Sequence, residues 1–138
     1  STFSLILEGG KIPPYFYRKE ENEMKDIEKV IKVDDREYPI VFNLNVMEAI
    51  QEEYGTVQKW GELSEGKDGE PNAKAVIFGI TQMINEGIDI RNEKNGTDVK
   101  PLTLKQAGRL ISQIGVDVAS KQLQDTVIES TKSNEKNA

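Results

Sequence analysis

Two pairs of neighbouring carboxylates, Glu52–Glu53 and Glu20–Glu21, are the side chains of this sequence best suited to acid–base chemistry. The chain has no histidine and no cysteine, so any acid–base catalysis would depend on such groups. Neighbouring residues on a helix point in different directions, so neither pair can face one bond together. Catalytic carboxylates also need buried surroundings that shift their pKa, and a solvated surface explains both pairs more simply. We therefore predict no catalytic residues and no enzymatic activity.

A metal or cofactor site is not predicted either. Asp68–Gly69 resembles the middle of a calcium loop, but an EF-hand would also need acids near Ser64 and Gly66 and a glutamate near Ala75. None of these ligands is present. Zinc lacks its preferred histidine and cysteine ligands, and the chain has no glycine-rich phosphate loop.

Length and charge limit the class of protein and its partners. The chain has 138 residues, which suits one domain, and its net charge is −6. That charge argues against nucleic acid and anionic membranes as partners, because both bind through lysine and arginine. No apolar run approaches the roughly 20 residues that cross a bilayer. The absence of cysteine fits a reducing cytoplasm.

Chain-breaking residues divide the sequence into segments. Paired glycines, paired prolines and a charged run all lie before Met24, and a polar stretch follows Thr131. We expect residues 1–23 to be an N-terminal extension or arm outside the core, residues 24–131 to be a single mainly helical domain, and residues 132–138 to be a polar tail.

The domain begins with a predicted β-hairpin. Residues 27–33 and 37–44 are rich in β-branched and aromatic residues, and they surround a turn at Asp34-Asp35-Arg36. Pro39 cannot donate a ladder hydrogen bond, so it needs an edge position or an irregularity. The predicted fold is mainly α (α+β): this small N-terminal hairpin, followed by a bundle of about four to five helices.

Three helices are predicted before residue 88. The first begins at a capping box of Asn45 and Glu48, with Asn43 as a competing cap, and Gly55 ends it. Thr56 caps a short second helix. Asn72 caps a longer third helix with a broad apolar face, with Phe78 at its flank, and Gly87 is expected to end that helix.

Two more helices are predicted after a loop. Residues 88–101 are polar and rich in turn-forming residues, which indicates a mobile loop. Thr103 and Gln106 form a capping box for the next helix, and Gly115 ends it. A last helix follows, with an apolar stripe that contains Leu123 and Val127.

Residues 102–130 resemble a helix-turn-helix, so a small DNA-binding regulator is the alternative function. A DNA reader needs basic residues on its second helix. The cations and anions of this helix pair cancel: Lys105, Arg109 and Lys121 against Asp117, Asp125 and Glu129. A helical hairpin that packs its apolar stripe into the core explains the pattern better.

The order of three motifs resembles the tail assembly chaperones of long-tailed phages and prophages of Gram-positive bacteria. The motifs are a strand end at residues 38–43 (YPIVFN), a helix end at residues 52–55 (EEYG) and a later helix start at residues 103–111 (TLKQAGRLI). The resemblance covers residues 25–131. The order and spacing of the motifs carry the resemblance.

The resemblance implies a non-enzymatic function in the bacterial host cytoplasm. The resemblance implies that the protein binds the tape measure protein, keeps its apolar helices soluble and helps bring in tail tube proteins. The tape measure and tail tube proteins are therefore the expected partners, with no nucleic acid and no membrane. Homo-oligomerisation is left open.

The expected partner-binding surface is an apolar groove between helices with an acidic rim, since such grooves bind amphipathic helices. Trp60 is the one tryptophan of the chain, and Val57 lies on the same short predicted helix. Tryptophan is enriched at interface hot spots, but packing in the core explains it equally well. We choose Val57 and Trp60 as candidate partner-binding residues at the edge of the groove.

Overall fold

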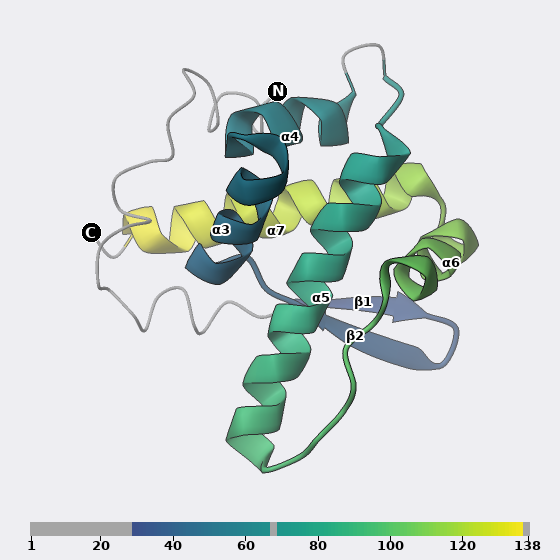
Figure 1. Ribbon diagram of the computed structural model, residues 1–138, viewed down its shortest axis with the longest axis vertical. Helices are drawn as coiled ribbons and strands as arrows, with labels where there is room; N and C mark the ends of the chain where they lie inside the picture. The colour runs from purple at the N-terminus through teal and green to yellow at the C-terminus, as the bar shows by residue number, and fades with distance from the viewer. Residues whose placement is uncertain (1–28, 67–68, 137–138) are drawn as a thin grey trace.

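The computed structural model describes residues 29–66 and 69–136. These residues form a two-stranded antiparallel hairpin followed by five helices, so the predicted mainly α fold is confirmed (Figure 1). The elements are β1 (Lys29–Val33), β2 (Arg36–Ile40), α3 (Leu44–Tyr54), α4 (Val57–Glu65), α5 (Ala73–Asn95), α6 (Leu104–Ile114) and α7 (Val116–Lys136).

Helix α5 is the centre of the molecule. It contacts β2, α3, α4, α6 and α7, and in Figure 1 it crosses in front of α7. The predicted extension at residues 1–23 lies outside the described residues. Helix α7 continues to Lys136 and so includes most of the predicted polar tail at residues 132–138.

The hairpin forms where the sequence predicts it, but its second strand is shorter. The strands pair from Lys29↔Ile40 to Val33↔Arg36, which leaves a two-residue turn in which Asp34 has φ 55°. The predicted strand through residue 44 is wrong, because pairing ends at Ile40. Val41 and Phe42 are both buried, and the Val41 amide donates to the Met83 carbonyl of α5 at 3.2 Å. The chain therefore leaves the sheet to pack on α5.

Helix α3 begins at the competing cap. The Asn43 side chain accepts from the Val46 amide at 3.2 Å, so the predicted Asn45–Glu48 capping box is wrong. Asn43 and Asn45 both donate their side-chain amides to Glu86 of α5, at 2.7 and 3.0 Å. A carboxylate from another helix, which the local sequence cannot reveal, thus engages both asparagines.

The other predicted caps are confirmed. The side chains of Thr56 and Asn72 accept hydrogen bonds from the first turns of α4 and α5. Thr103 and Gln106 make the reciprocal capping box of α6. Each cap satisfies a backbone amide that would otherwise have no partner at a helix start.

Helix α5 does not end at Gly87. It continues for two more turns to Asn95, and Gly96 adopts the left-handed conformation (φ 65°) that ends it. Gly87 instead allows close packing: a Cβ there would lie 2.8 Å from Cβ of Pro39. The predicted end of this helix is wrong. A glycine can either end a helix or allow another element to pack closely against it, and Gly87 does the second because Pro39 of β2 packs on it.

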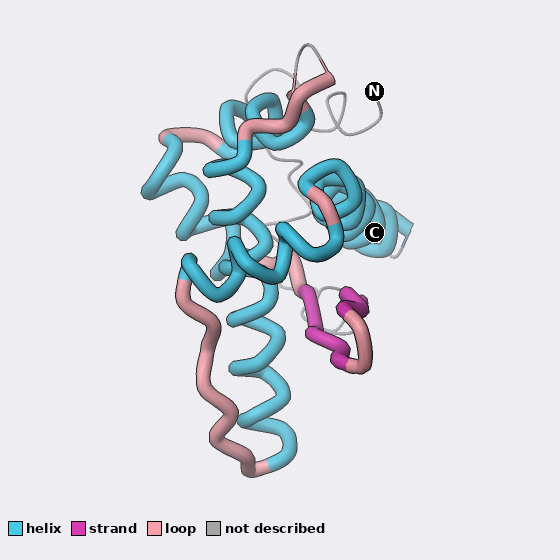
Figure 2. The backbone as a smooth tube through the Cα atoms, turned by 90° about the vertical axis from the view of Figure 1, so that its right-hand side faces the viewer, coloured by secondary structure: helices cyan, strands magenta, loops and turns pink. Residues whose placement is uncertain are grey.

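Two asparagines of α5 hold the connection to α6, so the predicted mobile loop at residues 88–101 is also wrong. Asn92 accepts from the Val99 amide at 3.0 Å and donates to the Val99 carbonyl at 2.9 Å. Asn85 makes the same two bonds with Leu102, at 2.8 and 2.9 Å. These side chains lie two helical turns apart, and the connection runs back along α5 (Figure 2).

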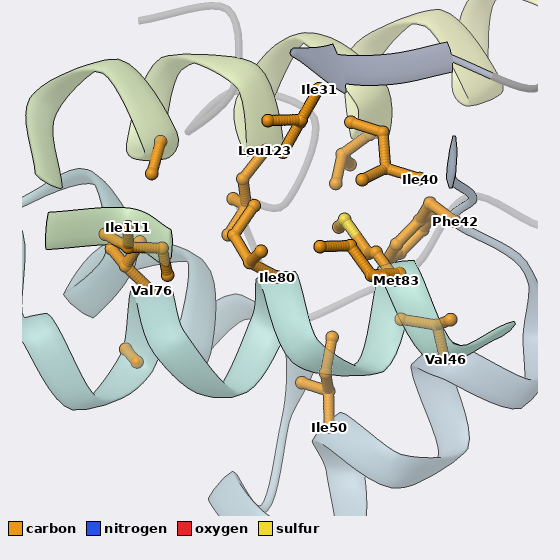
Figure 3. Packing of buried hydrophobic residues seen from close by; sticks show 14 of the residues in the cluster. Ile31, Ile40, Phe42, Val46, Ile50, Val76, Ile80, Met83, Ile111 and Leu123 are labelled. Atoms are coloured by element: carbon orange, nitrogen blue, oxygen red, sulfur yellow. The ribbon is translucent and has the colours of Figure 1, made fainter. Parts of the chain in front are cut away.

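One hydrophobic core joins all seven elements. Figure 3 shows Ile31 and Ile40 of the hairpin and Leu123 of α7 facing Ile80 and Met83 of α5. Leu123 is fully buried, as its place on the predicted apolar stripe requires. The same cluster reaches α3 and α6 through Ile50 and Ile111.

Candidate functional site

The predicted partner-binding residues lie inside the core. Trp60 is fully buried and Val57 is 1% exposed. The Trp60 indole nitrogen donates to the Ala75 carbonyl at 3.0 Å, and Ser120 of α7 donates to the Ser64 carbonyl of α4 at 2.7 Å. Helix α4 is thus held on both sides. The core interpretation of Trp60 fits the structure, and partner contact by Trp60 or Val57 would require α4 to move.

The carboxylates considered for chemistry do not form a site. Glu52 and Glu53 are exposed on the last turn of α3, and Glu53 makes an ion pair with Lys74 of α5 at 3.9 Å. Glu20–Glu21 and Asp68 lie outside the described residues. Among the described residues, no cluster of acids could hold a metal ion.

An apolar groove lies between α5 and α6, next to the end of α3. Its floor and walls are Ile77 and Phe78 of α5 with Leu104 and Gly108 of α6, and its volume is about 530 Å³. Leu104 is 53% exposed, although it is a large apolar side chain. We call this feature the α5–α6 groove.

Aromatic packing fixes one wall of the α5–α6 groove. The rings of Phe78 and Tyr54 meet edge to face, with their centroids 5.6 Å apart. The Tyr54 hydroxyl is buried, and burial raises the pKa of this phenol, with a further contribution from the charge of Glu53. The raised pKa keeps the Tyr54 hydroxyl protonated near pH 7, so an uncharged ring packs against Phe78.

Three charged side chains form the rim of the groove: Glu53, Lys74 and Lys105. The expected acidic rim is therefore wrong for this groove, because lysines outnumber acids there. Glu53 and Lys74 partly neutralise each other through their ion pair. Lys105 makes no ion pair with another residue that the structure describes.

A second cavity, of about 510 Å³, lies between the hairpin turn and α6, and its lining is different in character. Charged side chains of both signs, among them Asp34, Arg36 and Arg109, surround it together with two glutamines of α6. Such a lining suits hydrated polar contacts. The α5–α6 groove is the better candidate for binding apolar side chains.

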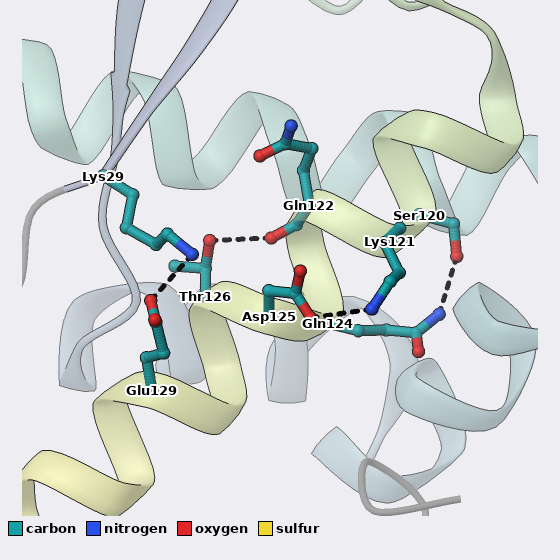
Figure 4. A network of polar contacts seen from close by, with 8 residues as sticks. All are labelled: Lys29, Ser120, Lys121, Gln122, Gln124, Asp125, Thr126 and Glu129. Carbon is teal, nitrogen blue, oxygen red and sulfur yellow. Dashed lines mark hydrogen bonds and ion pairs between the residues drawn. The ribbon is translucent and has the colours of Figure 1, made fainter.

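The helix pair proposed as the alternative DNA reader has little free positive charge on its second helix. Between residues 116 and 130 the one basic residue is Lys121, which pairs with Asp125 at 3.3 Å (Figure 4). Glu129 pairs with Lys29 of β1 at 2.7 Å. The opposite face of α7 is buried through Ala119, Leu123 and Val127. These features favour a structural function for the pair.

The sequence pattern of the groove residues does not predict a site. Phe78 lies at the flank of the broad apolar face of α5, and Leu104 begins the apolar stripe of α6. Both belong to amphipathic patterns that ordinarily predict core. One feature of the sequence distinguishes these residues from core residues: the apolar face of the helix is wider than one neighbouring helix can cover.

Comparison of the chain with protein-family models, with curated proteins and with solved structures finds no match. Within the described part of the chain, no helix has the length and apolar character needed to span a membrane.

Proposed function

We propose that this protein is a tail assembly chaperone of a long-tailed phage or prophage. It binds an apolar helical segment of the tape measure protein in the host cytoplasm, keeps that segment soluble and assists the addition of tail tube subunits. It does so without catalysis, as a binding protein.

The observation that carries this proposal is the place of the motifs around the α5–α6 groove. The helix end at residues 52–55 supplies Glu53 to the rim, and the helix start at residues 103–111 supplies Leu104, Lys105 and Gly108. Two of the three motifs behind the family resemblance therefore border the α5–α6 groove, whose floor and walls are mainly apolar. A shared binding surface gives a physical reason for those motifs to occur together.

The structure also offers a suitable surface for the task. An amphipathic helix binds by placing side chains at i, i+3, i+4 and i+7 into an apolar groove. Ile77, Phe78 and Leu104 present such a surface beside the polar rim. The net charge of −6 opposes self-association of the chaperone while it holds an apolar partner.

We expect co-expression with a tape measure segment to give a soluble complex that elutes together in size-exclusion chromatography. Leu104→Glu should reduce the soluble fraction of the partner severalfold, because it places a charge in the apolar contact. Leu104 is half exposed at the first position of α6, where an acid is compatible with the helix, so this variant should remain folded.

Val118→Glu is the matched control. Val118 is 49% exposed on α7 and does not line the groove, so this change should leave the complex intact. If the tape measure segment is equally insoluble with and without the chaperone, and no complex elutes, the assignment is wrong. Trp60→Ala does not serve as a site variant, because removing a fully buried indole costs about 3–5 kcal/mol of stability.

A further inference from the structure

We infer that the α5–α6 groove selects an amphipathic helix whose apolar stripe is flanked by acidic side chains, and that Lys105 is the cation that contacts those acids. This inference rests on the proposed function, since it names the chemical class of the helix that the same groove binds.

The lining of the groove favours a helical occupant over an extended one. All of its residues belong to the helices α3, α5 and α6. Apart from the amides of the first turns, the backbone of these helices is bonded internally, and a helix offers no strand edge with which an extended peptide could pair. A helical peptide forms its backbone hydrogen bonds internally and needs only side-chain contacts with the groove. A volume of about 530 Å³ suits a few large apolar side chains rather than a whole helix.

The charges on the two sides of the groove are not equivalent. On the α3 side, Lys74 lies 3.9 Å from Glu53, so its charge is partly neutralised. On the α6 side, Lys105 is exposed and has no ion pair with another described residue. Lys105 also lies in the first turn of α6, where the helix dipole adds positive potential. The α6 side of the groove is therefore positive.

The negative net charge of the protein contrasts with the positive α6 side of the groove, and this contrast affects which helices bind there. A chain with net charge −6 as a whole attracts basic helices and repels acidic ones. The α6 side of the groove offers an acidic helix a local attraction. Charges at the rim of an interface act mainly on the rate of association and on its dependence on salt. Lys105 should therefore set which helices reach the groove, while Ile77, Phe78 and Leu104 hold them.

Two synthetic helical peptides test this inference. They share one apolar stripe, and the residues beside the stripe are glutamates in one peptide and lysines in the other. Fluorescence anisotropy should show the glutamate peptide binding about three- to tenfold more tightly, with a difference that shrinks at high salt. Lys105→Glu should remove or reverse this preference.

Lys100→Glu is the matched control, since Lys100 is also exposed and does not line the groove. It should leave the preference unchanged. Leu104→Glu should weaken the binding of both peptides, which locates them in the groove.

Three results would overturn the inference: equal binding of the two peptides, a preference that survives Lys105→Glu, or no binding of either peptide. In each case the proposed function still stands if a tape measure segment forms a soluble complex in the co-expression experiment. Self-association that Leu104→Glu abolishes would assign the groove to a second copy of the chain and would also overturn the inference. Failure of the co-expression experiment would instead remove the function on which the inference rests.

Discussion

Leu123→Asp is expected to abolish cooperative folding or to lower stability by more than any other change considered. Leu123 is fully buried, and its side chain lies against Gly79 of α5. Removing a buried leucine costs about 2–5 kcal/mol, and burying an unpaired carboxylate costs several kcal/mol more. That sum is comparable with the whole stability of a small domain, about 5–15 kcal/mol.

Urea unfolding followed by circular dichroism measures this effect. Val118→Asp is the control on the same helix, and it should change stability by no more than about 0.5 kcal/mol, because Val118 is half exposed. If Leu123→Asp unfolds at the same urea concentration as the unchanged protein, this face of α7 is not part of the core.

Gly79→Ala should destabilise the protein by about 1–3 kcal/mol, although alanine ordinarily favours a helix over glycine. An added Cβ would lie 2.5 Å from Cζ2 of Trp60 and 2.9 Å from Cδ1 of Leu123. The indole cannot easily move away, because its nitrogen is bonded to the Ala75 carbonyl. The clash therefore outweighs the gain in helix propensity.

Gly108→Ala is the matched substitution, and it should have the opposite sign. A Cβ at Gly108 would meet Cδ1 of Ile77 at 3.6 Å, an ordinary contact, so the gain in helix propensity of up to about 1 kcal/mol remains. Thermal unfolding of the two variants in parallel measures the contrast. A rise in melting temperature for Gly79→Ala would show that α4 and α7 do not pack on α5 as described.

The sequence predicts those features that depend on neighbouring residues. Thr56, Asn72 and Thr103 were recognised as helix caps because a cap and the amide it satisfies lie within three residues of each other. The hairpin was recognised because two β-rich runs surround a short polar turn. In both cases the information is contained in one short window of the chain.

The features that the sequence does not predict depend on distant partners. Gly87 was expected to end α5, but Pro39 packs on it and the helix continues. The connection after α5 was expected to be mobile, but the side chains of Asn85 and Asn92 bind its backbone. Predicting either feature requires knowledge of which elements contact each other in the folded protein.

The candidate site also combines features that depend on neighbouring residues with features that depend on distant ones. The family resemblance identified the motifs that border the groove, but it did not identify the groove itself. Residue type alone suggests Trp60 as a contact residue, whereas in the structure its indole is buried between α4 and α5. Leu104 and Phe78 have patterns typical of core residues, and only the packing of α3, α5 and α6 shows that these side chains line an open groove.

The central claim is that the α5–α6 groove binds an apolar helix of the tape measure protein. The most direct test is an NMR titration of the isotope-labelled protein with that segment. We predict that the amide signals of Ile77, Phe78, Leu104 and Gly108 shift together and saturably, whereas that of Val118 does not. Shifts confined to the hairpin or to α7, or no shifts with a segment that stays soluble in the presence of the protein, would contradict the account.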